Sequence, residues 1–239
     1  MPSVSLAQSC PDTQAQAAET RPEPSVSALE TALTTRIDSA RAHEGLSSLE
    51  SHPVLAEIAA RHARDMAERA YAADVTPEGD SLLDLVRQED RQSLYSAFGA
   101  NILIAGAGAS ADQLHAAMMQ SADNAANVRR AGFSHSGIGS VEQDGRIYVV
   151  QLFARVDGAL TEPLPVQAGS APALRTALTG ARMVPVSWSV NAPDGALLLR
   201  GSGDRLRDGR GKAVEGYLNL DVAVGQDVYT LRGPFVRLD

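Results

Sequence analysis

The hydrophobic positions of the chain first recur at helical spacing and later at strand spacing, with the change near residue 130. The first helical pattern consists of Leu29, Leu33 and Ile37, which follow one another every four residues. Ser27 and Glu30 form a capping-box pattern just before it. The sequence therefore predicts an amphipathic helix that begins at Ser27 and ends before the glycine of AHEGL.

A second amphipathic helix is predicted in SHPVLAEIAARHARDMAERA, which places several apolar residues on one helix face. Ser51 can cap this helix, and Pro53 suits its first turn because proline lacks the N–H that the first turn leaves unpaired. The helix is expected to end near residue 70. A shorter helix is predicted near SLLDLVRQ.

The stretch NILIAGAGASADQLHAAMMQ predicts a strand, a turn and a helix from about residue 112 to 121. Gly106, Gly108 and Ala111 fit the spacing of a dinucleotide-binding turn. Such a site needs a parallel strand after the helix. The chain instead continues with two alternating runs around Asp144-Gly145, which predict an antiparallel hairpin because both residues accept a positive φ. We therefore expect no nucleotide cofactor, and no cofactor of another kind is indicated.

Composition shifts divide the chain into four predicted parts. Residues 1–26 are rich in Ser, Pro, Gln and Ala and predict a flexible leader. Residues 27–158 form the main domain, 159–180 a linker with Pro and Ala, and 181–239 a small all-β domain of short alternating runs. Trp188, the only tryptophan, is expected to anchor the core of that small sheet.

Charge and cysteine content exclude several classes of function. A formal net charge of -8 argues against nucleic acid as a partner, because an acidic surface gains little from releasing counterions. No apolar run is long enough for a transmembrane segment. The single cysteine, Cys10, follows small residues and is a possible lipid anchor; the alternative is a cysteine in a disordered tail.

Motifs over residues 27 to 157 resemble, in order, those of the CAP superfamily (cysteine-rich secretory, antigen 5 and pathogenesis-related 1 proteins), in its bacterial form. IDSARAHEGLSSLESHPVLAEIAARHARDMAERAY resembles the family's opening helices, and TPEG resembles its SPDG turn. GANI resembles GENI, MMQSADNAANV resembles WMNSPGHRANI, and FSHSGIG and YVVQLFA resemble the strands that close the domain. The resemblance implies an α+β fold, a three-layer α-β-α sandwich, followed here by a small C-terminal antiparallel β domain.

The resemblance also implies a central cleft, which in the family commonly carries two histidines and two acidic residues. In this chain Asp74 stands at the loop histidine, Ala100 at the glutamate of GENI, and Asn124 at the histidine of GHR. Asp84 stands near an acidic cleft position, and Asn101 follows the altered glutamate position. Asp74, Asp84, Asn101 and Asn124 are thus the expected residues of a vestigial binding cleft. No catalytic residue and no metal site are expected, because asparagine and alanine cannot replace histidine as zinc ligands.

The remaining histidines and one basic loop are assigned mainly structural roles. His62 lies on the apolar face of the second predicted helix and is expected in the core with a hydrogen bond. His43 and His52 flank a turn and are expected to be exposed, while His135 offers no reliable triad spacing. The loop GDRLRDGRGK is expected to be a solvated hairpin tip, with contact to an anionic surface as the alternative.

The leading hypothesis is a secreted or periplasmic, non-catalytic CAP-domain protein that acts as a binding or structural module at the cell envelope or outside the cell. Its partner would be an unknown protein, glycan or lipid. One alternative is a hydrolase of cell-wall or peptide substrates that uses Asp74 and Asp84 as acid and base. A further alternative is a lipid or sterol binder, an activity that the family resemblance allows.

Overall fold

The computed structural model describes residues 27–168, 172–180, 182–207 and 213–238. Cys10, the predicted leader and part of the GDRLRDGRGK loop lie outside the described residues. Within them the helices are α1 (Ala28–His43), α2 (Pro53–Arg69), α3 (Leu82–Glu89), α4 (Ala111–Gln120) and α5 (Ala122–Arg129). None of the helices in these ranges is long and apolar enough to cross a membrane.

The strands follow a two-part pattern along the described chain. The first part contains β1 (Glu50–Ser51), β2 (Ser93–Gly106), β3 (His135–Gln143) and β4 (Arg146–Leu160). The second contains β5 (Gln167–Ala168), β6 (Thr176–Leu178), β7 (Met183–Asn191), β8 (Leu197–Gly201), β9 (Val214–Val224) and β10 (Asp227–Leu238).

Capping residues explain where most of these helices begin. The predicted capping box of Ser27 and Glu30 opens α1, and a second box, of Ser110 and Gln113, opens α4. The predicted Ser51 cap of α2 is wrong. Ser51 belongs to β1 and is paired in parallel with β3, so the helix starts one residue later, after His52, without a side-chain cap.

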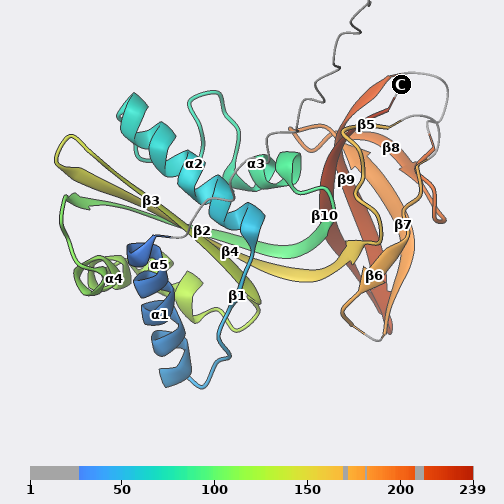
Figure 1. The fold of residues 1–239 in the computed structure, drawn as a ribbon. Helices are drawn as coiled ribbons and strands as arrows, with labels where there is room; N and C mark the ends of the chain where they lie inside the picture. Colours follow the sequence, from blue (N-terminus) through green and yellow to red (C-terminus); the bar gives the residue numbers. More distant parts are fainter. Residues whose placement is uncertain (1–26, 169–171, 181, 208–212, 239) are drawn as a thin grey trace, which may run out of the picture.

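The strands form one sheet in the order β1-β3-β4-β2-β10-β9-β7-β8 (Figure 1). The predicted hairpin is confirmed: β3 and β4 are antiparallel and joined by Asp144 (φ 51°) and Gly145 (φ 72°). β2 runs antiparallel to β4 along most of its length. A single bridge, between Tyr95 of β2 and Arg232 of β10, continues the ladder into the C-terminal strands.

Helices cover both faces of the first half of the sheet, which makes three layers, as the family resemblance implies (Figure 1). α2 and α3 pack on one face, where their apolar residues form a cluster with those of β2 and β4. α1, α4 and α5 pack on the other face in a separate cluster. Alternate residues of β2 take part in the two clusters, since side chains of a strand point alternately to its two faces.

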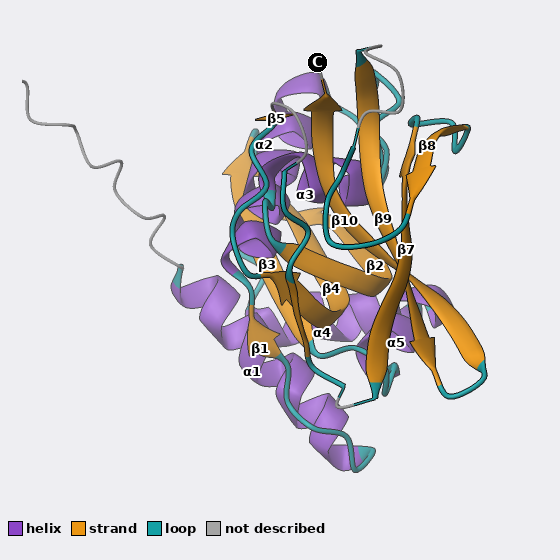
Figure 2. Ribbon diagram, turned by 90° about the vertical axis from the view of Figure 1, so that its right-hand side faces the viewer, coloured by secondary structure: helices purple, strands orange, loops and turns teal. Residues whose placement is uncertain are grey.

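A third cluster fills one face of the C-terminal strands. Figure 2 shows these strands beside the layered half of the molecule. Trp188 belongs to this cluster and is 3% exposed, as expected of a core tryptophan. Leu164 and Leu174, from the predicted linker, are buried in the same cluster, and β6 pairs with the end of β4. The boundaries of the four predicted parts stay a prediction.

Candidate functional site

Asp74 lies in the loop between α2 and α3, and Asp84 lies in the first turn of α3. The backbone carbonyl of Asp74 accepts a hydrogen bond from the Leu82 N–H at 3.2 Å, which joins this part of the loop to the start of α3. The carboxylate of Asp84 accepts hydrogen bonds from the N–H and the hydroxyl of Ser81, at 3.3 and 2.6 Å, in the capping box of α3. Asp74 is exposed, whereas Asp84 has a structural role at the helix start.

Asn101 is fully buried on β2 and fastens α5 to the sheet. Its Nδ2 donates to the backbone carbonyl of Asn124 at 3.1 Å and to Gln151 Oε1 at 3.2 Å. Its Oδ1 accepts a hydrogen bond from Asn127 Nδ2 at 3.0 Å. The structure therefore brings Asn101 and Asn124 together, through the backbone of Asn124.

The four predicted cleft residues form two separate pairs. The neighbours of Asn101 along β2, Ala100 and Ile102, belong to the cluster under α2 and α3. Asn101 itself points to the opposite face, that of α5, while Asp84 caps α3. The two pairs thus lie on opposite faces of the sheet, and a binding role for these four residues stays a prediction.

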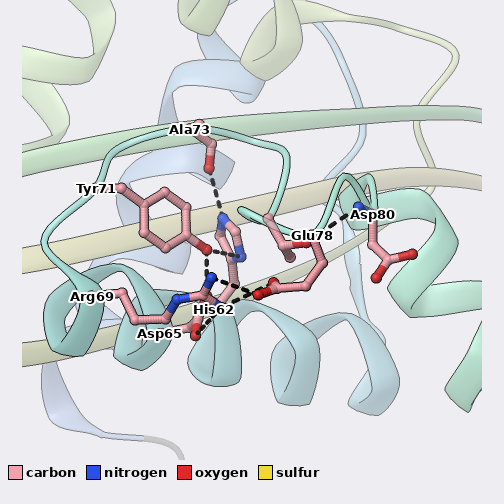
Figure 3. A network of polar contacts seen from close by, with 8 residues as sticks. His62, Asp65, Arg69, Tyr71, Ala73, Glu78 and Asp80 are labelled. Atoms are coloured by element: carbon pink, nitrogen blue, oxygen red, sulfur yellow. Dashed lines mark hydrogen bonds and ion pairs between the residues drawn. The ribbon is translucent and has the colours of Figure 1, made fainter.

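A polar network fixes the loop after α2, next to Asp74 (Figure 3). His62 Nε2 lies 2.7 Å from the carbonyl oxygen of Ala73, so this nitrogen carries the proton and donates it. The Tyr71 hydroxyl donates to Asp65 at 2.5 Å and lies 3.5 Å from His62 Nδ1. His62 is 2% exposed, which confirms the expected hydrogen-bonded core position.

Arg69 extends this network to the tip of the loop. Its two terminal nitrogens donate to the Glu78 carboxylate at 2.9 and 2.6 Å, a bidentate pair (Figure 3). The hydrogen bond from Arg69 lowers the pKa of Glu78. Burial, together with the hydrogen bond to Asp65, raises the pKa of the Tyr71 hydroxyl. At neutral pH the Tyr71 hydroxyl is thus neutral and Arg69 is paired with Glu78. These contacts hold the loop against α2.

A second polar cluster joins the residue after β1 to the first residues of β2 and β3, and it includes His52, which is 12% exposed in its side chain. The expectation that His52 is exposed is therefore wrong. Its ring packs edge-on against His135, with centroids 5.7 Å apart, and its Nε2 lies 3.2 Å from Ser93 Oγ and 3.5 Å from Asp90 Oδ2. The sequence gives no local pattern for this cluster, because His52, Asp90 and His135 are far apart along the chain.

Asp90 is the charged centre of this second cluster. Burial alone would raise its pKa, but hydrogen bonds from the backbone N–H of Ser93, the Tyr95 hydroxyl and the N–H of Gln92 outweigh burial and lower the pKa. Burial lowers the pKa of His52, against the opposing effect of the Asp90 carboxylate and with a smaller contribution from His135. The pair is therefore an ionised aspartate beside a neutral histidine at neutral pH.

A polar pocket of about 480 Å³ lies next to this cluster, between the loops that precede β1 and β3. Glu50 and Ser134 line it, and both contact His135: Ser134 Oγ is 2.8 Å from Nδ1, and Glu50 Oε2 is 3.5 Å from Nε2. Across the pocket, the Arg155 guanidinium pairs with Asp157 at 2.8 Å. Arg155 and Asp157, two of the charged residues that line the pocket, are thus paired with each other.

Comparison with known proteins places these features in a family. The profile of the cysteine-rich secretory protein family, CAP, matches residues 34–153, which is half of the chain. No curated protein matches the sequence.

The chain is also similar to solved structures, among them those of three bacterial proteins. An extracellular protein of Bacillus anthracis with an SCP domain is 19% identical, with a TM-score of 0.44, over 53% of this chain and 40% of its own. The outer surface protein of Borrelia burgdorferi is 17% identical, with a TM-score of 0.46, over 53% and 91%. A cysteine-rich secretory protein of Staphylococcus aureus is 18% identical, with a TM-score of 0.39, over 53% and 38%.

The chain thus spans less than half the length of the Bacillus protein. The family match over residues 34–153 agrees with the three-layer arrangement of the helices and strands in this part of the chain. The chain therefore belongs to the CAP family of cysteine-rich secretory proteins.

Proposed function

We propose that this chain is a non-catalytic CAP-domain protein that acts as a binding or structural module outside the cell or at the cell envelope. The observation that supports this most directly is the state of the family's cleft positions. Ala100, at the position of the GENI glutamate, packs in the apolar cluster under α2 and α3. Asn124 lies on α5, and its backbone carbonyl accepts a hydrogen bond from the Asn101 side chain.

The residues at these positions do not fit a zinc ion. Zinc in proteins takes nitrogen, sulfur and carboxylate ligands in a closed set of three or four. Ala100 supplies no donor, and the Asp84 carboxylate is already bound to Ser81. Across the described ranges, no three His, Cys, Asp or Glu side chains are placed so that they could hold a metal ion.

Thermal unfolding with and without zinc tests this proposal. Because a ligand that binds only the folded state raises its stability, a zinc site would raise the melting temperature at stoichiometric metal. We expect equal melting temperatures with zinc, with magnesium and with a chelator. A rise that is specific to zinc and is abolished by Asp74→Asn would contradict the proposal.

One structural observation supports the hydrolase alternative. The hydrogen bond between Asp74 and Leu82 holds Asp74 near the start of α3, the helix that carries Asp84. Its test is hydrolysis of cell-wall fragments by the full chain and by Asp74→Asn and Asp84→Asn variants. We expect no turnover by any of the three. Turnover that both substitutions abolish, with folding intact, would establish the alternative in place of the proposal.

A further inference from the structure

A separate polar pocket of about 370 Å³ lies at the end of β8, in the C-terminal strands and apart from the CAP cleft positions. Trp188 of β7, Gly201 of β8 and residues 202–205 and 207, which follow β8, line it. The size suits a small ligand, since binding pockets in proteins start at about 300 Å³.

The indole of Trp188 presents an unused donor at this pocket. The residue is 3% exposed, and its Nε1 is buried with no hydrogen-bond partner among the described residues. Gly201 is paired with Trp188 across the two strands, and a Cβ there would lie 2.8 Å from indole Cε2, the carbon bonded to Nε1. Glycine at this position thus leaves room for the six-membered ring of the indole, whose nearest atom, Cζ2, would lie 2.3 Å from an added Cβ. The buried N–H of the same ring has no partner among the described residues, although a buried N–H normally has an acceptor.

Arginines dominate the charge around the pocket. Arg205 and Arg207, both exposed, line it together with a single acid, Asp204. Arg200 lines it as well, although its guanidinium lies 3.6 Å from Asp221. In a protein with a formal net charge of -8, this concentration of positive charge is local. Planar guanidinium groups suit carboxylates and phosphates, which they bind through two parallel hydrogen bonds.

Two further side chains suit a ligand that also carries hydroxyl groups. The Asp204 carboxylate can accept hydrogen bonds from hydroxyls, and the Ser202 hydroxyl can donate or accept. We propose that this pocket binds a sugar that carries a carboxylate or a phosphate group. The anionic group pairs with Arg207, the indole N–H donates to a ligand oxygen, and sugar hydroxyls reach Asp204 and Ser202.

A neighbouring pocket of about 410 Å³ shares Gly203 and Asp204 with this one. Two adjoining pockets provide room for a glycan chain that extends beyond one sugar. This pocket shares no residue with the CAP cleft positions, so its test is independent of the test of the proposed function.

The only tryptophan of the chain reports on binding directly. The full chain is titrated with glucuronic acid and with glucose 6-phosphate while Trp188 fluorescence is followed, and glucose and inorganic phosphate serve as controls. We expect a saturable change with at least one anionic sugar at concentrations up to about 10 mM, and no saturable change with glucose. Saturation by one anionic sugar alone identifies the anionic group.

Variants then locate the site. Arg207→Gln, an exposed substitution, is expected to weaken binding about tenfold or more, because it removes charge-assisted hydrogen bonds. Trp188→Phe, followed by calorimetry, removes the N–H donor together with part of the indole ring and is expected to weaken binding too, provided that circular dichroism shows the variant to be folded. Arg61→Gln, at an exposed arginine of α2 that pairs with Glu89, is the matched control and should bind like the native chain. No saturable binding, equal binding by Arg207→Gln, or equal binding of inorganic phosphate and the sugars would overturn the proposal.

Discussion

At the scale of single residues, the cluster around His52 links a buried charge to the junction of three strands. Asp90 accepts hydrogen bonds from two backbone N–H groups at 2.9 Å and from Tyr95, so its charge is satisfied without a permanent cation. His52 lies beside it with Nδ1 buried and without a partner among the described residues. A neutral imidazole is the stable form here, because a second proton would add a buried charge next to His135.

This arrangement predicts that stability falls as the solution becomes acidic. The pKa of His52 is lowered by burial in the folded chain, so below the ordinary histidine pKa of about 6.5 the unfolded chain binds the proton more readily. The contribution of neutral His52 to the free energy of unfolding is therefore complete above about pH 6.5, and it decreases as the pH falls below that value. Urea unfolding between pH 5 and 8, a range of about three units, measures this dependence.

His52→Gln is expected to reduce the slope of stability against pH, because glutamine does not titrate. Part of the slope remains, since burial also lowers the pKa of His115. His43→Gln, at an exposed position of α1, is the control and should leave the slope as it is. An unchanged slope in His52→Gln would show that this histidine does not titrate differently in the two states.

At the scale of elements, the close approach of α2 to β3 depends on two glycines. Gly137 and Gly139 lie on the side of β3 that faces α2, where their hydrogens meet the helix backbone around Ala56 and Ala60. An added Cβ at either position would lie closer to the helix backbone than real Cβ atoms are found. The G-I-G motif therefore has a packing role: it sets the distance between helix and sheet.

Gly139→Ala is expected to destabilise the fold by about 3 kcal/mol or more, because neither the helix backbone nor β3, which is paired with β4 along its length, can move away at low cost. Gly132→Ala is the matched control, since a Cβ there has nothing within 4 Å. Its stability should stay within about 0.5 kcal/mol of the native value. Urea unfolding measures both, and an equal effect of the two substitutions would refute the packing role.

Helix prediction succeeds where apolar residues recur at helical spacing and fails where they are few. The capping boxes and apolar faces of α1 and α4 were visible in the sequence. No helix was predicted for α5, because it has few apolar residues: only Ala125 and Val128 are buried. This helix is held by tertiary contacts, notably the hydrogen bonds between Asn101 and Asn127 and from Asn101 to Asn124.

At the scale of the whole molecule, Arg87 of α3 joins the layered half to the C-terminal strands. The residue is 7% exposed, and its guanidinium donates to the carbonyls of Gly233 and Leu218, both at 2.7 Å, and to Asn219 at 3.0 Å. It also lies over the Tyr217 ring, 4.5 Å from the centroid. Burial lowers the pKa of Arg87 to about 10, so it is still charged at neutral pH.

Arg87→Met is expected to destabilise the chain by about 2–4 kcal/mol, because it leaves buried carbonyls without their donor. Two probes follow unfolding: Trp188 fluorescence for the C-terminal strands and helical circular dichroism for the CAP half. The two transitions should coincide in the native chain and separate in the variant, with Trp188 unfolding first. Arg61→Met, at an exposed position, is the control and should keep them coincident.

The sequence by itself determined the family, the three-layer fold, the hairpin at Asp144-Gly145 and the core position of His62. These features depend on residues close together in the chain, or on motifs whose order is enough to recognise them. Only the tertiary structure decided that the predicted cleft residues lie on opposite faces of the sheet, and that His52 is buried beside His135 and Asp90. Burial and pairing of this kind join residues far apart in the sequence, and no local pattern encodes which of them will meet.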